Sequence, residues 1–326
     1  MRKIRATICV FLIISVLVTI FYGRDKIVEK PDLSAPQGYK YILNLWNIDI
    51  FEGGRGSRKQ FLLDASIEFE RQNPGVLVLA SSRTEEGYYE SIKNNVKPDI
   101  LSFGTGIEVY NSAEITECAF TGGKIGDKTY AVPWCRGGYV LISNGKNKFD
   151  GNLKDLLVSK SDYTLPLLAF SMQGYTAENI VVKKPMDAYV DFVSGRFPFM
   201  LGTQRDVVRL NARGFTAEII ALTEYNDLYQ YLSVVTEDEN KREYAQKFVK
   251  FILSESVQAK LNKISMLSVF YKVQLESGLD KLQVDGKYLT ISAFTAKEKI
   301  KEIEEESYLT AQGQENRLLN LKKLLV

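Results

Sequence analysis

The residues best suited to chemistry stand in one short loop, Glu52-Gly53-Gly54-Arg55-Gly56-Ser57. Its three glycines let the backbone turn sharply and approach a ligand closely. Its carboxylate and guanidinium groups can bind hydroxyls or ions. The glycine spacing matches neither GxGxxG nor GxxxxGK[ST], so the loop gives little support to nucleotide binding. It is either one wall of a ligand site or a plain turn between two elements.

The elements around this loop predict where it lies. Tyr41–Trp46 is a short apolar run typical of a buried strand. Ser57 is a suitable N-cap for a helix whose apolar stripe runs from Phe61 to Phe69. Asn73-Pro74-Gly75 ends that helix and leads into the strand Val76–Val78. The segment is therefore a βαβ unit, and the loop lies at the carboxyl edge of its sheet, where ligands bind in open α/β folds.

Three further segments place polar or aromatic side chains after predicted strands. Gly104-Thr105-Gly106 follows the strand Ile100–Phe103, on the same sheet edge as the first loop. Trp134 and Arg136 lie in or beside a glycine-containing loop between two strands. Trp134 is either exposed for stacking on a ligand or a plug of the core. The polar loop Gly202–Asp206 follows another strand, and several such loops together favour a cleft.

The remaining pattern extends this alternation of strands and helices. The predicted elements are a helix at Ala188–Phe192, strands at Phe197–Leu201, Ala217–Leu222 and Tyr231–Thr236, a helix pair over Lys241–Ile264, and a charged helical tail over Thr295–Val326.

Composition excludes several classes of function. The chain has 326 residues, 45% hydrophobic and 25% charged, which is enough for two globular domains. Its net charge of +2 gives no reason to expect nucleic-acid binding. It contains no histidine, which removes the commonest general base and zinc ligand. An enzyme would have to use paired carboxylates among Glu52, Asp99 and Asp206, and nothing in their spacing brings two of them to a working separation.

The N-terminus predicts export. Arg2, Lys3 and Arg5 precede an apolar run from Ala6 to Tyr22, so residues 1–23 form a signal peptide or, as the bulky residues before Arg24 favour, an uncleaved anchor. Residues 24–40 are then a tether, and the rest of the chain is extracytoplasmic, anchored to the membrane or secreted if the segment is cleaved.

The three cysteines form no framework. Cys9 lies at the start of the apolar run and not after it, so it is misplaced for lipid attachment. Cys118 and Cys135 either pair or remain buried thiols. Without a CxxC motif or a Cys/His cluster, we expect no metal site and no cofactor.

Five stretches, in this order, resemble the sugar-type solute-binding proteins of ABC importers, the group that includes maltose-binding protein. They are Leu43–Trp46 with the helix ending at Phe69–Val76, Lys97–Ile100, Tyr130–Trp134 with Asn144, Phe192–Met200, and Lys247–Ile252 with Gln258.

The resemblance implies an α/β architecture, the two-lobed type II periplasmic-binding-protein fold, in which each lobe is a mixed sheet with flanking helices. Residues 41–105 plus 231–264 would form the first lobe and residues 106–230 plus 265–326 the second. Chain crossings near Thr105 and at Tyr231–Thr236 would form the hinge. The second lobe is short for this group, above all between Asn144 and Ala188, where it looks trimmed of helices.

Carried over by position, the resemblance assigns ligand contacts to the strand ends that face each other. The candidate ligand-binding residues are Trp46, Glu52, Gly53, Arg55, Thr105, Trp134, Arg136, Gln173, Thr203, Gln204, Arg205, Asp206 and Tyr225. Aromatic faces and polar groups suit a carbohydrate, whereas Arg55, Arg136 and Arg205 would also suit a carboxylate or phosphate.

The resemblance implies a monomeric, non-enzymatic protein that delivers a carbohydrate or an anionic sugar derivative to the permease subunits of an ABC transporter. The alternative is an anchored extracytoplasmic sensor or interaction protein on the same fold, without transport.

Overall fold

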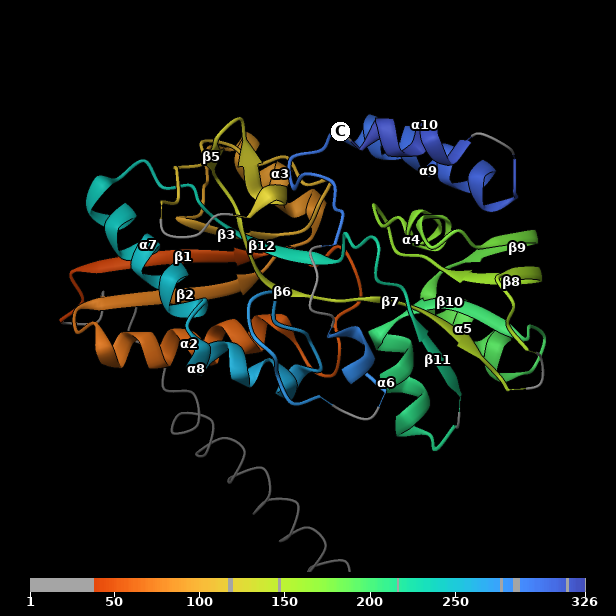
Figure 1. Cartoon of the computed structure of the whole chain (residues 1–326). Coiled ribbons are helices and arrows are strands. Elements are labelled where there is room, and N and C mark those ends of the chain that lie inside the picture. The colour runs from red at the N-terminus through yellow and green to blue at the C-terminus, as the bar shows by residue number, and fades with distance from the viewer. Residues whose placement is uncertain are drawn as a thin grey trace, which may run out of the picture. The chain divides into compact units, whose positions relative to one another are not determined.

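Residues 38–116, 120–145, 148–215, 217–275, 278–283, 288–314 and 317–325 are described by a computed structural model (Figure 1). Tyr41–Val326 forms one compact unit. The predicted anchor, most of the tether, Cys9 and Cys118 lie outside the described residues. Cys135 is a buried free thiol. Within the described residues, no helix is long and apolar enough to cross a membrane.

The first sheet has the order β2-β1-β3-β12-β6. Its strands are β1 (Tyr41–Asn47), β2 (Val76–Ser82), β3 (Ile100–Phe103), β6 (Val132–Arg136) and β12 (Tyr229–Val234). β1, β2 and β3 run parallel, and β12 runs antiparallel to both of its neighbours. This mixed sheet is the first lobe of the expected fold.

Alternating side chains of β1 pack helices on both faces of this sheet. Leu43 and Leu45 belong to the core under α2 (Arg58–Gln72) and α7 (Glu239–Ile252). Trp46 points to the other face and meets the Tyr88 ring edge-on, at 6.4 Å between centroids. Tyr88 lies on α3 (Glu85–Lys93). The lobe is completed by α8 (Glu255–Gln258), the 3₁₀ helices η1 (Thr121–Gly123) and η2 (Ala259–Ile264), and the hairpin of β4 (Lys124–Ile125) and β5 (Lys128–Thr129).

The second sheet has the order β11-β7-β10-β8-β9, with β8, β9 and β10 parallel and β7 antiparallel to β10 and β11. Its strands are β7 (Tyr139–Ser143), β8 (Asn152–Ser159), β9 (Thr176–Lys183), β10 (Phe199–Thr203) and β11 (Glu218–Ala221). The other elements of this half are α4 (Pro166–Met172), α5 (Pro185–Val193), α6 (Gln204–Ala212), η3 (Asp280–Leu282), α9 (Lys297–Ala311) and α10 (Arg317–Leu324). Figure 1 shows α9 lying beside α4, with α10 packed on α9.

The segment between Asn144 and Ala188 is richer in structure than expected. It supplies the strands β8 and β9 and the helix α4, so whatever trimming of helices was expected there leaves at least this one. Pro166 starts α4, where its missing N–H costs no hydrogen bond.

Two expected loops are regular structure. Cys135 and Arg136 belong to β6, and only Gly137-Gly138 separates it from β7. Gly202–Asp206 is the end of β10 and the start of α6. A capping box makes this junction, because the Asp206 carboxylate accepts from the Thr203 N–H at 3.0 Å and the Thr203 hydroxyl accepts from the Arg205 N–H at 3.2 Å.

The crossings between the lobes also differ from the expectation. After Thr105 the chain returns to the first sheet as β6, although the expected boundary placed that strand in the second lobe. The chain instead crosses at Gly137-Gly138, between β6 and β7, and at Leu222–Leu228, between β11 and β12. A short crossing needs residues that turn tightly, which a glycine pair supplies.

Candidate functional site

The two lobes meet along a crevice between the carboxyl ends of their parallel strands. The segment after β3 touches the loop after β8, where Gly106 lies against the Tyr163 ring. The loop after β1 touches the helix after β10, where Arg205 donates to the Gly54 carbonyl oxygen. Ligands bind at such edges in open α/β sheets, so this crevice is the candidate site.

One end of the crevice is held by the Arg209 cluster, defined as Glu52, Gly54, Arg205, Asp206 and Arg209. The Arg209 guanidinium lies 2.6 Å from the Glu52 carboxylate of the first lobe and 3.5 Å from the Asp206 carboxylate of its own helix. Because the Arg209 side chain is only 12% exposed, this ion pair is better shielded than a surface pair.

The other end is held by the Lys297 cluster, defined as Glu85, Tyr89, Tyr163 and Lys297. The Lys297 ammonium pairs with the Glu85 carboxylate and lies 4.9 Å from the Tyr163 ring centre and 5.2 Å from that of Tyr89. The Tyr163 hydroxyl donates to the same Glu85 carboxylate at 3.2 Å. Glu85 and Tyr89 come from α3 of the first lobe, and the other two residues come from elements of the second sheet's half.

The space between these clusters is almost filled. A cavity of about 10 Å³ remains there, enough for roughly one water molecule. It is lined by Phe51, Glu52, Ser159, Ser161, Thr164, Pro185, Thr203 and Leu228. The lobes are therefore closed on each other in this structure.

A larger groove of about 580 Å³ adjoins the Lys297 cluster. Its walls are the Tyr89 ring, the segment Gly106–Val109 after β3, Ile125, and the segment Phe294–Glu298 at the start of α9. It combines two aromatic residues, Tyr89 and Phe294, with the charged residues Glu108, Lys297 and Glu298.

Polar groups at the carboxyl edge of the first sheet bond to each other. The side-chain Oδ1 of Asn47 accepts from the Ser102 hydroxyl at 2.8 Å and from the Gln230 side-chain amide at 3.3 Å. The Ser102 oxygen in turn accepts from the Trp134 indole N–H at 3.1 Å. The Arg58 guanidinium donates to the Gln230 carbonyl oxygen at 3.3 Å. This buried network leaves few free partners for a ligand.

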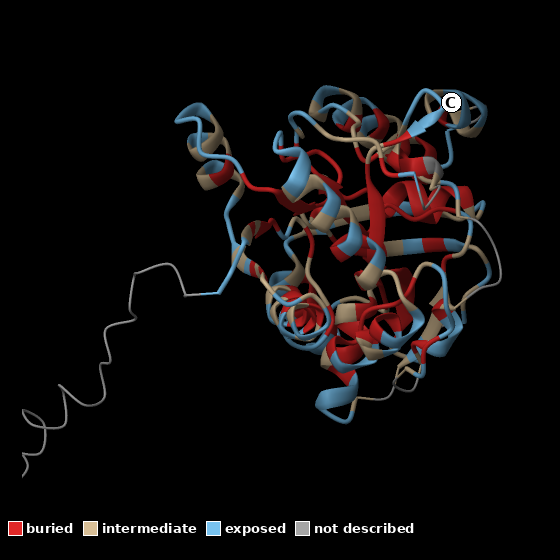
Figure 2. Ribbon diagram, turned by 90° about the vertical axis from the view of Figure 1, so that its left-hand side faces the viewer, coloured by how far each residue is buried: buried red, intermediate tan, exposed pale blue. Residues whose placement is uncertain are grey.

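Of the two alternatives for Trp134, the structure shows the buried core residue. Its ring is fully buried and stacks on Phe61 at 5.4 Å between centroids. Six other candidates are also less than a tenth exposed in this arrangement, namely Trp46, Thr105, Arg136, Gln204, Asp206 and Tyr225 (Figure 2 shows the buried segments in red).

Two of these buried side chains hold the chain near a crossing. The Arg136 guanidinium donates to the backbone carbonyl of Leu282 at 2.9 Å, and the side-chain Oε1 of Gln204 accepts from the Gly138 N–H at 3.0 Å. Their contacts fix the segments around Gly137-Gly138 rather than point at an open cleft.

The remaining candidates divide between the crevice and other places. Glu52 and Thr203 line the small cavity, and Arg205 reaches across the crevice to Gly54. Gln173 ends α4, beside Thr223. Gly53 is half-buried and Arg55 is exposed. Ligand binding by all these residues stays a prediction.

Sequence reasoning missed four residues that join the lobes: Glu85, Tyr163, Arg209 and Lys297. A signal for Tyr163 was present. The segment from Asp155 to Phe170 repeats the pattern of the first unit, with an apolar strand, a polar loop and a helix opened by proline. Glu85, Arg209 and Lys297 sit on helices, where a charge is usually solvated, so only the tertiary structure identifies them.

Two buried carboxylates lie where the lobes join. Burial raises the pKa of Asp206 to about 6, against the lowering effects of the Thr203 N–H and of Arg209. Burial likewise raises the pKa of Asp227 to about 6. The Asp227 carboxylate accepts from the Tyr139 hydroxyl at 2.6 Å and from the Leu165 N–H at 2.9 Å.

Comparison with solved structures identifies the architecture. The chain resembles the sugar-binding protein MalE of Xanthomonas citri, with a TM-score of 0.59 at 12% identity over 87% of this chain and 95% of that one. Maltose-bound MalE3 of T. maritima gives 0.58 at 12% identity over 87% and 98%. The fold is that of the two-lobed solute-binding proteins. Iron-bound HitA of Pseudomonas aeruginosa shares it as well, with 0.53 at 13% identity over 82% and 99%.

No protein-family model and no curated protein sequence matches this chain. The likeness is therefore one of fold, and the same fold is seen in proteins with a sugar and with iron.

Replacing Gly54 by alanine should destabilise the first lobe. An added Cβ would lie 2.1 Å from the Ile264 carbonyl oxygen and 2.3 Å from that of Ser265, so the backbone must shift. We expect a loss of roughly 1–3 kcal/mol, measured by chemical denaturation. Gly53→Ala is the matched control, since its Cβ would meet nothing closer than 3.8 Å. Equal stability of the two variants would contradict the close approach.

Stability should fall as pH rises from about 4 to about 6. The folded chain keeps protons on Asp206 and Asp227 in that window, whereas the unfolded chain has lost them, so each group contributes a loss of at most about 3 kcal/mol. Denaturation at several pH values measures the slope. Asp227→Asn should reduce it, while the exposed control Asp64→Asn should not. A slope unaffected by Asp227→Asn would overturn the assignment.

Proposed function

We propose that this chain is the extracytoplasmic solute-binding component of an ABC importer, and that it binds a saccharide between its two lobes without chemical conversion. The supporting observation is the likeness of fold, along 87% of the chain, to a sugar-binding protein and to a maltose-bound protein. The permease subunits of the importer are its proposed partners, and the N-terminal segment is its proposed attachment to the membrane.

The groove beside the Lys297 cluster is the proposed entry to the saccharide site. Tyr89 is half-buried there, and its hydroxyl accepts from the Glu108 N–H at 3.1 Å, which fixes the ring. A fixed aromatic face can cover the C–H surface of a sugar ring, while neighbouring charged and backbone groups bond its hydroxyls. A volume of about 580 Å³ lies in the range of small-molecule sites.

A neutral saccharide fits better than an anion. Two of the three arginines that would favour an anion are engaged within the protein, Arg136 with the Leu282 carbonyl and Arg205 with the Gly54 carbonyl. The ammonium of Lys297 is balanced by Glu85. Anionic sugar derivatives belong in the screen as the competing ligand class.

A panel of neutral and acidic mono- and oligosaccharides tests the proposal. One class should raise the melting temperature of the full chain, because a ligand that binds only the folded state stabilises it. Tyr89→Leu should abolish that shift. Tyr271→Leu, in a separate groove beside α7, should retain it. The absence of a shift with every sugar would overturn the saccharide proposal.

The second candidate is a sensor or interaction protein without transport. The observation that favours it is the closed crevice, which is bridged at both ends by the protein's own charged groups and leaves only about 10 Å³ between them. Affinity capture from the native membrane distinguishes the two: permease subunits support transport, and a sensor kinase or an envelope protein supports the second candidate.

A further inference from the structure

We infer that Tyr163 is an interlobe clasp, seated on the bare backbone of Gly106 and held there by Glu85 and Lys297, which keeps the lobes closed when no solute is bound. The closure itself stands independently of the proposed function. The further consequence, that a solute must displace Tyr163 to bind, rests on the proposed function.

The backbone of Tyr163 is strained. Its φ is +59°, in the left-handed region that bulky side chains seldom adopt. Such a conformation costs on the order of 1–3 kcal/mol and persists only where surrounding contacts impose it. The turn is held within its own loop, where the Thr164 N–H and hydroxyl both donate to the Ser161 carbonyl oxygen. Glu85 and Gly106 of the opposite lobe then hold the side chain in place.

The seat for Tyr163 requires glycine. Gly106 has a φ of +92°, and a Cβ there would lie 2.9 Å from the Cγ atom of Tyr163. The ring therefore lies directly on the backbone that follows β3, at the carboxyl edge where a solute is expected. In the closed state the protein's own aromatic ring takes this place.

The charged partners hold Tyr163 from two sides. Glu85, at the start of α3, accepts from the Tyr163 hydroxyl at 3.2 Å and pairs with Lys297. The Lys297 ammonium lies over the Tyr163 ring at 4.9 Å, within the range of a cation–π contact. Because Glu85 and Lys297 are 24% and 35% exposed, a polar solute or water can reach and separate them.

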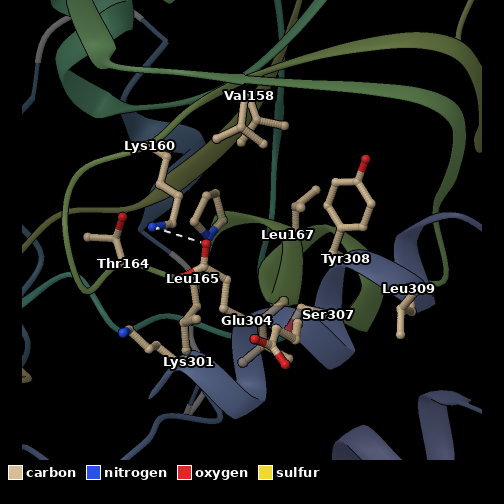
Figure 3. Close-up of a pocket in the computed structure, with 14 residues that line it drawn as sticks. Val158, Lys160, Thr164, Leu165, Leu167, Lys301, Glu304, Ser307, Tyr308 and Leu309 are labelled. Atoms are coloured by element: carbon tan, nitrogen blue, oxygen red, sulfur yellow. Dashed lines mark ion pairs between the residues drawn. The ribbon is translucent and has the colours of Figure 1, made fainter. Parts of the chain in front are cut away.

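The loop that carries Tyr163 is anchored at its end, where it also borders a pocket. The Leu165 N–H donates to Asp227, in the crossing between β11 and β12, so movement of the loop is coupled to that crossing. Figure 3 shows a pocket of about 670 Å³ at the end of the loop, lined by Leu165, Leu167 and Tyr308 and bridged by the ion pair of Lys160 and Glu304 at 3.2 Å.

The test measures the distance between the lobes in the full chain in detergent, without solute. Spin labels are attached through non-canonical residues at two exposed positions, Arg71 in the first lobe and Glu178 in the second. The wild-type chain should show one short distance by pulsed electron paramagnetic resonance. Lys297→Met removes the ion pair with Glu85, and Gly106→Ala fills the space that the Tyr163 ring occupies. Each variant should add a longer distance.

Lys299→Met is the matched control, because Lys299 lies on the same helix and pairs only locally, with Glu302 at 3.0 Å. It should keep the wild-type distance. An open wild-type chain, or a Lys297→Met chain as closed as wild type, would overturn the clasp. Circular dichroism melts verify that each variant is folded.

The saccharide panel separates the two proposals. If a sugar binds, Tyr163→Leu, which removes the clasp ring without changing a residue that lines the groove, should bind it more tightly than wild type, since the closed population no longer competes. If no sugar binds either chain while Lys297→Met still opens, the proposed function fails and the clasp stands. If a sugar binds both chains with equal affinity, the clasp does not oppose solute entry and that part of the inference is wrong.

Discussion

The arrangement of the first lobe depends on one buried amide, that of Gln230. Its carbonyl oxygen accepts from Arg58 of α2, and its NH₂ group donates to the Ile48 carbonyl at 2.9 Å and to the Ser102 hydroxyl at 3.1 Å. It thus joins β12, which arrives from the second lobe, to β1, β3 and α2. A buried amide left without these partners would cost about 1–3 kcal/mol. The network therefore fixes how β12 and α2 sit against β1 and β3 in the first lobe.

Because the buried polar groups at the carboxyl edge of the first sheet already hydrogen-bond to one another, few of them remain available to a ligand. A solute site needs polar groups that are satisfied only when the ligand is present. Here Asn47, Ser102, Trp134 and Arg58 satisfy one another. Thr105 and Tyr225 are the exceptions among the buried candidates, because the hydroxyl of each is buried with no hydrogen-bond partner within the described residues. The hydrogen-bonding capacity available to a solute therefore lies nearer the groove and the two charged clusters than in the floor of the crevice.

The closed crevice also changes the role expected for the glycine-rich loop Glu52–Ser57. Gly54 is required because the loop packs against the backbone of Ile264 and Ser265, so a close approach does exist, but to the protein itself. Ser57 caps α2 by accepting from the Gln60 N–H at 3.3 Å. The loop still serves the crevice, since Glu52 provides the carboxylate that meets Arg209 of the other lobe. Its role in this structure is to join two lobes.

The sequence by itself determined the local elements and the fold class. Apolar periodicity, Ser57 and Asn73-Pro74-Gly75 predicted the first βαβ unit, which is confirmed by β1, α2 and β2. Their order along the chain, with the resemblance, predicted the two-lobed fold. These features are short-range, because periodicity and capping depend on residues within a few positions of each other.

Only the tertiary structure decided which side chains meet across the crevice. Glu52 pairs with Arg209, 157 positions away, and Glu85 with Lys297, 212 positions away. A surface charge on a helix gives no sign in the sequence of a distant partner. The burial of Trp134 was equally undecidable, because a tryptophan beside glycines suits an open site and a packed core alike, and the choice depends on Phe61 and Ser102 reaching it from other elements. Local chemistry fixes the elements, whereas the site depends on how two lobes pack.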